Sequence, residues 1–209
     1  MPDDIHKFEG LEQVKELSES AKKIFLGMLA ACVYSWLTIA TTTDVRLLTN
    51  SVSSPLPIIQ TEIPIVGFYW VAPLLLLSVY LYFHLYLQRL WESLAVLPEV
   101  LPDGTPLDLK AYPWLLNGLV RAHFLRLRDS RPPFSRLQVG ISILLGWWLV
   151  PFTIGSFWFR YLARHDWAGT TFHIGLLVIV IGSAMLFQRL TRDTLRGREK
   201  KPFTNQSIK

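Results

Sequence analysis

The sequence predicts an all-α integral membrane protein with four transmembrane helices. Of its 209 residues, 51% are hydrophobic and 13% are aromatic, and the mean hydropathy is +0.31. Soluble domains of this length are rarely so apolar. A helix that crosses a membrane needs about 20 mostly apolar residues. Four stretches of the chain meet that requirement, at residues 24–43, 63–87, 137–159 and 167–187.

The distribution of lysine and arginine predicts the side of the membrane that each connection faces. Residues 1–23 carry four of these side chains, the loop 88–136 carries seven, and the residues after 187 carry seven more. The two other connections carry only Arg46, Arg160 and Arg164. Because cytoplasmic connections hold the excess of basic residues, we expect both termini and the loop in the cytoplasm of a bacterial inner membrane.

The pattern divides the chain into three parts: a cytoplasmic amphipathic segment at 1–23, a transmembrane domain at 24–190 and a basic tail at 191–209. Within the loop, an amphipathic helix is predicted from Pro113 onward. Its basic side chains would face lipid phosphates at the cytoplasmic interface. The alternative is an ordinary helix packed on the base of the bundle. The residues in question are Arg121, Arg126 and Arg128.

The most polar stretch among the apolar runs is "FRYLARHDWAGTTFHI", at residues 159–174. His165, Asp166 and His173 could supply metal ligands, since imidazole and carboxylate bind divalent transition metals. Adjacent residues do not share a helix face, however, so a hairpin tip is the favoured interpretation. Asp166 would then cap the fourth helix and pair with nearby arginines, or those arginines would bind phosphates. The aromatic residues Trp158, Tyr161 and Trp167 would form an interfacial belt.

His84 lies inside the second predicted span. An ionisable side chain at that depth is a functional hypothesis by default. It also precedes Gln88 by one helical turn and lies near the predicted cytoplasmic boundary. A contact with Gln88, together with snorkelling of the ring toward the interface, is therefore the favoured interpretation.

Small residues recur on two predicted spans. Gly27, Ala31 and Ser35 follow each other at a spacing of four, and Gly175 and Gly182 at a spacing of seven. Small faces let helices approach closely in lipid. Because an internal bundle needs only some of these faces, we expect a homo-oligomer.

Catalytic and cofactor motifs are missing from the sequence. It contains no GxSxG, HExxH or GxGxxG string and no phosphate-binding loop. We therefore expect no cofactor, no enzymatic activity and no nucleic-acid partner. The favoured function is a membrane anchor or scaffold, which presents its basic loop and tails to an unknown cytoplasmic protein. The alternative is an oligomeric, pore-forming effector that perturbs the bilayer, and a small transporter or intramembrane enzyme comes third.

Three strings carry a family resemblance: "QRLWE" at 88–92, "DGTPLDLKAYPW" at 103–114 and "RYLARHDW" at 160–167. With them, roughly residues 20–190 resemble the membrane portion of bacterial pentapeptide repeat-containing membrane proteins. In that family the membrane portion is followed by repeats that wind into a right-handed β-helix. This sequence has no run of such repeats after residue 190. The resemblance therefore implies a membrane module only, without catalytic residues.

Overall fold

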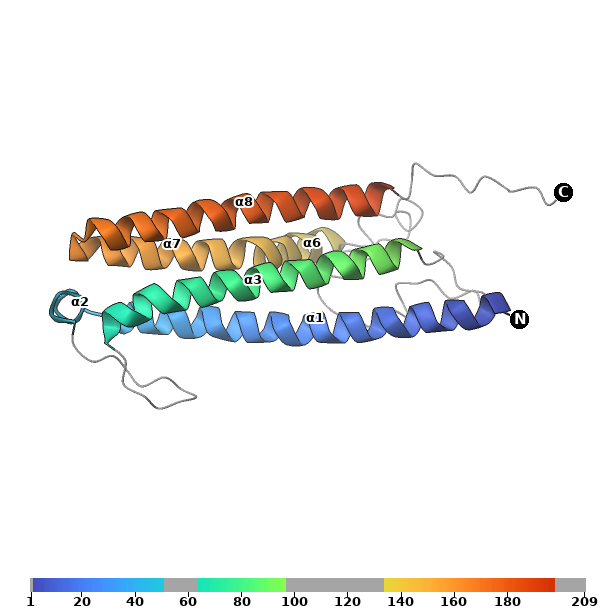
Figure 1. Cartoon of the computed structure of the whole chain (residues 1–209), viewed down its shortest axis with the longest axis horizontal. Coiled ribbons are helices and arrows are strands. Elements are labelled where there is room, and N and C mark those ends of the chain that lie inside the picture. The colour runs from blue at the N-terminus through green and yellow to red at the C-terminus, as the bar shows by residue number, and fades with distance from the viewer. Residues whose placement is uncertain (1, 51–63, 97–133, 198–209) are drawn as a thin grey trace. The chain divides into compact units, whose positions relative to one another are not determined.

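The computed structural model describes residues 2–50, 64–96 and 134–197. These residues form helices and no strand, and four helical segments are long and apolar enough to cross a membrane. The third of these segments, Leu137–Arg164, runs through four consecutive elements, α6, η2, α7 and η3. The prediction of an all-α membrane protein with four spanning helices is therefore confirmed. The elements are α1 (Pro2–Thr41), α2 (Asp44–Thr49), α3 (Ile65–Val96), α6 (Ser135–Ile143), the π-helical turn η2 (Leu144–Trp148), α7 (Leu149–Tyr161), the 3₁₀ turn η3 (Leu162–Arg164) and α8 (Trp167–Gly197). Figure 1 labels the α-helices among them.

The amphipathic segment and the first predicted span form one continuous helix, α1. No proline interrupts residues 3–41, so nothing in the sequence ends the helix at the predicted boundary. From Val14 to Ser35 the buried positions of α1 are spaced alternately by four and three residues, which is the spacing of a coiled-coil seam. They are Val14, Ser18, Ala21, Phe25, Met28, Cys32 and Ser35, and Thr38 is buried three residues further on.

The chain divides into two compact units. The first, here called the terminal unit, comprises residues 1–23, 84–146 and 186–209. The second, the hairpin unit, comprises residues 24–83 and 147–185 and includes the turn between α7 and α8. The boundary at residues 23 and 24 coincides with the end of the predicted amphipathic segment.

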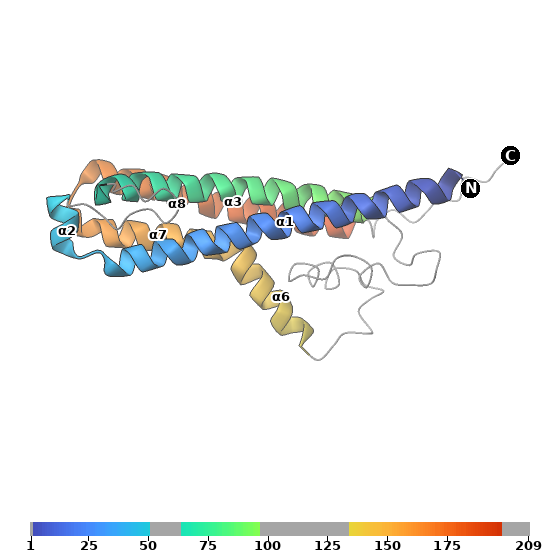
Figure 2. The ribbon, with the colours of Figure 1, turned by 90° about the horizontal axis from the view of Figure 1, so that it is seen from below.

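Four helices pack against one another through aromatic side chains in the hairpin unit. In both Figure 1 and Figure 2 the hairpin-unit portions of α1, α3, α7 and α8 run alongside one another. Phe68 of α3 contacts Tyr34 of α1 and Phe157 of α7, with ring centroids 5.9 and 5.7 Å apart. Trp70 of α3 stacks on Phe172 of α8 at 4.5 Å. Large buried rings therefore fill the interior of this unit.

Two prolines interrupt the backbone hydrogen bonds of the hairpin unit. A proline has no N–H, so the carbonyl four residues before it loses its helical donor. For Pro151 that carbonyl belongs to Trp147, and the hydroxyl of Tyr80 donates to it at 3.1 Å. For Pro73 it belongs to Tyr69, and Nε2 of His173 lies 3.0 Å away. A buried polar side chain from another helix thus lies within hydrogen-bond distance of each carbonyl that has lost its helical donor.

The terminal unit has a smaller polar contact between α3 and α8. The side-chain amide of Gln88 donates to the hydroxyl of Thr194 at 2.9 Å and to the carboxylate of Glu92 at 3.1 Å. Beside it, the α3 side chains His84, Leu87, Leu90, Trp91 and Leu94 are buried. On α1, Glu19 and Lys23 form an exposed ion pair at 3.0 Å.

Candidate functional site

The polar residues of the hairpin unit gather where α7 turns into α8, close to the end of α1 and to α2. Arg160, near the end of α7, donates from Nε and Nη2 to the carbonyl oxygen of Thr42 at 3.1 and 2.6 Å. Its Nη1 forms an ion pair with Asp44, the first residue of α2. The last carbonyls of a helix have no helical donors. Arg160 therefore caps the end of α1 with a positive charge, which the helix dipole favours.

A second arginine joins the turn to α2. Arg164 of η3 donates from Nη1 to the carbonyl oxygen of Leu47 at 2.9 Å, and Leu47 itself is fully buried. From the sequence, Arg160 and Arg164 were expected to pair with Asp166 or with phosphates. Their hydrogen bonds go instead to Asp44 and to two backbone carbonyls, because the chain brings α2 against η3.

Asp166 caps α8, as predicted. Its Oδ1 accepts the backbone N–H of Ala168 at 3.1 Å, and its Oδ2 accepts the hydroxyl of Tyr161 at 2.8 Å. The Tyr161 hydrogen bond, the backbone N–H groups of Ala168 and Gly169 and the charge of Arg164 together hold the pKa of this carboxyl below its usual value. Asp166 is therefore ionised at neutral pH, and its negative charge stabilises the N-terminal end of α8.

Tyr161 occupies space that a side chain at residue 169 would otherwise fill. A Cβ built on Gly169 would overlap two ring carbons and the hydroxyl oxygen of Tyr161. Tyr161 is fully buried, whereas Trp167 is 84% exposed. Tyr161 is consequently a core residue, and its predicted place in an interfacial aromatic belt is wrong. The ring turns inward because Gly169 leaves room for it and Asp166 binds its hydroxyl.

His173 is fully buried in this cluster, with 0% of its surface exposed. Its Nε2 lies 3.0 Å from the Tyr69 carbonyl oxygen, and its Nδ1 lies 2.7 Å from the Gly169 carbonyl oxygen. The ring of Tyr161 packs on the imidazole with centroids 4.9 Å apart and planes inclined by 32°. Both ring nitrogens therefore face oxygen atoms that can only accept hydrogen bonds.

The three side chains considered as metal ligands have separate roles. His165 is exposed and takes a left-handed backbone conformation at φ 54°, which ends η3. Asp166 caps α8, and His173 lies on the carbonyls of Tyr69 and Gly169. Within residues 2–50, 64–96 and 134–197, no group of three or more His, Cys, Asp or Glu side chains is arranged to hold a metal ion.

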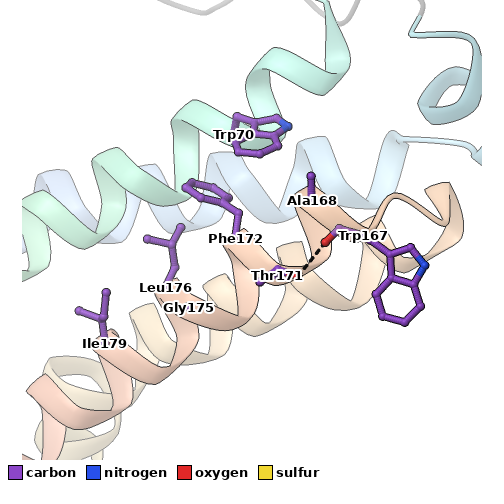
Figure 3. Close-up of a pocket in the computed structure, with 8 residues that line it drawn as sticks. All are labelled: Trp70, Trp167, Ala168, Thr171, Phe172, Gly175, Leu176 and Ile179. Carbon is purple, nitrogen blue, oxygen red and sulfur yellow. Dashed lines mark hydrogen bonds between the residues drawn. The ribbon is translucent and has the colours of Figure 1, made fainter.

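Beside this cluster, α3 and α8 form an open apolar groove of about 810 Å³ (Figure 3). It is lined by Trp70, Trp167, Ala168, Thr171, Phe172, Gly175, Leu176 and Ile179. The hydroxyl of Thr171 donates to the carbonyl of Trp167 at 2.8 Å and so presents little free polarity to the groove. Gly175 leaves open space in its wall. Acyl chains of the bilayer match such a lining.

His84 does not reach toward the membrane interface. It is 2% exposed, and its ring packs on Phe187 of α8 at 4.9 Å. The predicted snorkelling is therefore wrong, because residue 84 lies on the buried face of α3. Gln88, the expected neighbour, joins α3 to α8 through Thr194.

The small residues of α1 do not share one environment. Ser35 is buried and its hydroxyl donates to the Ala31 carbonyl at 2.7 Å, while Gly27 and Ala31 are exposed. Positions four apart rotate by about 40° at each step, since a helix has 3.6 residues per turn. The three small residues therefore do not lie on one face: Gly27 and Ala31 lie on the exposed face of α1 and Ser35 on its buried face. Gly175 and Gly182 of α8 are both exposed, with open space where a Cβ would lie.

Two features of the structure were not predicted from the sequence. The first is the pair of carbonyls left open by Pro73 and Pro151, which can be found by counting back four residues, but whose donors lie 104 and 67 residues from them. The second is the short helix α2, although Thr43 caps it and accepts the N–H of Arg46 at 3.4 Å. The predicted interfacial helix with Arg121, Arg126 and Arg128 lies outside the described residues.

No protein-family model, curated protein or solved structure matches this chain. The resemblance to pentapeptide repeat-containing membrane proteins therefore stays a prediction.

Proposed function

We propose that this chain is a non-enzymatic membrane anchor, which holds a basic loop and basic tails on one side of a bacterial inner membrane for a protein partner. In this proposal both termini and the loop 88–136 are cytoplasmic, and the turn between α7 and α8 faces outward. The role of the spanning helices is to hold that basic surface in place.

The use of buried polar groups in the hairpin unit carries this proposal. The hydroxyls of Tyr80 and Thr153 donate to the carbonyls of Trp147 and Leu149, and His173 lies on the carbonyl of Tyr69. A transport path would instead need polar side chains that line water or bind a substrate. Polar groups that bond to the backbone stabilise the helix packing, as an anchor requires.

The charge distribution supports a partner on the loop side. Seven basic residues lie in the loop 88–136 and seven more follow residue 187, so these two segments hold fourteen of the 21 lysines and arginines. Clustered basic side chains attract acidic surfaces at a distance, and this attraction is screened by salt. We therefore expect binding to the partner to weaken as ionic strength rises.

Cysteine labelling tests the orientation. In a Cys32→Ala background, single cysteines at Val45, Lys110 and Asn205 are labelled in intact cells with a membrane-impermeant maleimide. We expect Val45→Cys alone to react, because of these three positions only the one in α2 faces outward in this arrangement. Lys110→Cys and Asn205→Cys should react only after the cells are opened. Reaction of Lys110→Cys in intact cells refutes the proposed orientation.

Site-specific photocrosslinking tests the partner. A photoreactive amino acid at Leu119, in the basic loop, should form a protein adduct of defined mass in cells, whereas the same group at Val45 should not. Replacing Arg121, Arg126 and Arg128 together by glutamate should abolish the adduct, and replacing them by lysine should retain it because lysine keeps the charge.

The glutamate and lysine variants together show whether the charge of the loop selects the partner. An adduct that survives the glutamate variant shows that charge does not select the partner. Complete absence of an adduct from Leu119, with the protein inserted and abundant, rules out the anchor proposal for this loop.

The pore-forming alternative is separated by a leakage assay. Purified protein is reconstituted into vesicles that contain a self-quenched dye. An anchor leaves the dye trapped at every protein-to-lipid ratio. Release that rises steeply with protein density would favour an oligomeric pore instead.

A further inference from the structure

His173 of the hairpin unit has a hydrogen-bonding environment that a neutral imidazole cannot satisfy. The neutral ring carries one N–H, and its other nitrogen bears a lone pair. Both nitrogens of His173 face carbonyl oxygens, at 3.0 Å for Nε2 and 2.7 Å for Nδ1. Only the doubly protonated imidazolium can donate to both.

The two carbonyls differ in how much they need a donor. The Tyr69 carbonyl has lost its helical donor to Pro73, so Nε2–H of His173 replaces a missing bond. The Gly169 carbonyl lies one turn before His173 in α8 and is within reach of the helical N–H of residue 173. The neutral ring should therefore keep its proton on Nε2, with the Nδ1 lone pair against the Gly169 oxygen.

The side chains around His173 also favour its protonated form. The face of the Tyr161 ring packs on the imidazole, and an aromatic face attracts a cation. The hydroxyl of Tyr161 is bound to the carboxylate of Asp166. Burial works in the opposite direction, because it disfavours any charged group.

The other charged groups of the cluster are already engaged. Arg160 of α7 pairs with Asp44 of α2 and with the Thr42 carbonyl at the end of α1, and Arg164 of η3 binds the Leu47 carbonyl. From α3, Tyr69 contributes a phenol ring that packs on Tyr161. Asp166 is linked to the imidazole through Tyr161, whose hydroxyl donates to the carboxylate and whose ring packs on His173.

We propose that His173 is a proton-binding site, in which protonation of Nδ1 ties the first turn of α8 to the proline break of α3. A hydronium ion or a buffer acid gives its proton to Nδ1, one N–H bond forms, and water or the buffer base remains. The imidazolium then donates to Gly169 and Tyr69 together. Loss of that proton leaves only the Tyr69 bond. This inference keeps the contact between His173 and the Tyr69 carbonyl on which the anchor proposal draws. It concerns no residue of the basic loop, so the orientation and partner experiments test the anchor separately.

Nitrogen NMR on the full chain in nanodiscs tests the site directly. With ¹⁵N-labelled histidine, ring-nitrogen shifts distinguish the two neutral tautomers from the imidazolium between about pH 4 and about pH 8. The chain has five histidines, and the spectra of His173→Gln and His165→Gln identify two of them. We expect His173 to show two protonated nitrogens at acid pH and to keep its Nε2 proton when Nδ1 loses its own.

Replacement of Pro73 by alanine changes one partner of the ring and leaves His173 in place. The introduced alanine supplies a helical N–H to the Tyr69 carbonyl, which then no longer needs Nε2–H. The neutral ring should move its proton to Nδ1, and the titration midpoint should fall by about one pH unit, which is tenfold weaker proton binding. Pro151→Ala is the matched control, because it restores a donor to Trp147 and should leave both His173 readouts unchanged.

Two results overturn the proposal. One is a single neutral tautomer of His173 at every pH at which the protein stays helical. The other is a titration of His173 that Pro73→Ala and Pro151→Ala affect equally, since the Tyr69 carbonyl would then have no special part in proton binding.

Discussion

At the scale of single residues, Gly169 shows how a missing side chain shapes the hairpin. Its hydrogen atom leaves room for the ring of Tyr161, which packs on His173 and reaches the carboxylate of Asp166. The cap of α8, the buried tyrosine and the buried imidazole therefore depend on one another. A change at residue 169 is expected to disturb all three.

Gly169→Ala is expected to destabilise the protein by about 2 kcal/mol, because the added methyl group overpacks a filled site. Gly175→Ala is the matched control in the same helix, since open space surrounds its Cβ. That control should be neutral or up to about 1 kcal/mol more stable, through helix propensity alone. Unfolding in detergent followed by circular dichroism measures both variants. Equal stability of the two variants would show that the Tyr161 ring moves aside at no cost.

Asp166→Asn tests the charge on the helix cap. The folded-state pKa of Asp166 lies below its ordinary value of 3.8, so its stabilising contribution is present above that value and is lost as pH falls through the folded-state pKa. Asparagine also caps helices but carries no charge. We expect the wild-type protein to be more stable than Asp166→Asn at neutral pH and the difference to shrink below about pH 4. A difference that stays constant on acidification would contradict this.

At the scale of helices, the prolines of α3 and α7 are accommodated in the same way. Each frees a carbonyl, and a polar side chain of another helix lies against it. The π-helical turn at Leu144–Trp148 comes directly before α7, so the backbone is already distorted where Pro151 follows. A proline within a membrane helix thus creates a binding position for a donor from a neighbouring helix.

A double-mutant cycle measures this contact for Tyr80. Tyr80→Phe should cost about 1 kcal/mol in the wild-type background, the scale of an interhelical hydrogen bond in a membrane protein. The cost should be smaller with Pro151→Ala, because the introduced alanine supplies its own N–H to the Trp147 carbonyl. With Pro73→Ala the cost should stay unchanged. A Tyr80→Phe cost that is the same in all three backgrounds would show that Tyr80 contributes by packing alone.

At the scale of the whole molecule, the exposed surface of the spanning helices is rich in apolar side chains. On α1 it includes Leu26 and Leu37, at 52% and 61% exposure, and on α8 it includes Val178 and Ile179, at 66% and 51%. The small residues Gly27 and Ala31 of α1 are also exposed, as are Gly175 and Gly182 of α8. Such small residues on an outer face allow a helix of another copy to approach closely.

We expect a homo-oligomer that uses the exposed face of α1. Ala31→Leu should lower the mass of the assembly in mild detergent and leave insertion and helicity intact, because residue 31 faces outward. Ala30→Leu is the control, since residue 30 is also exposed but about 100° away around the helix. Native mass spectrometry and nanodisc sizing report the assembly. A wild-type protein that is monomeric in both would exclude the oligomer and the pore that depends on it.

Local sequence was sufficient to predict the four spans and the cap of α8. A hydrophobic run long enough to cross the bilayer has few stable alternatives to a helix, because every backbone polar group must be bonded internally. Asp166 directly precedes such a run, and a carboxylate at that position satisfies free N–H groups whatever else surrounds it. Neither prediction depends on which helices are neighbours.

The tertiary structure decided the partners of the polar groups and the direction that each helix face takes. Arg160 meets Asp44 across 116 residues, and His173 meets Tyr69 across 104. Ser35 turns inward and Ala31 outward within about one turn of α1. Hydropathy cannot distinguish these faces, since both core and lipid are apolar and a small residue suits either. Only the packing of helices distant in sequence determines which carbonyl lies within reach of which donor, and so where the imidazole of His173 can hold a proton.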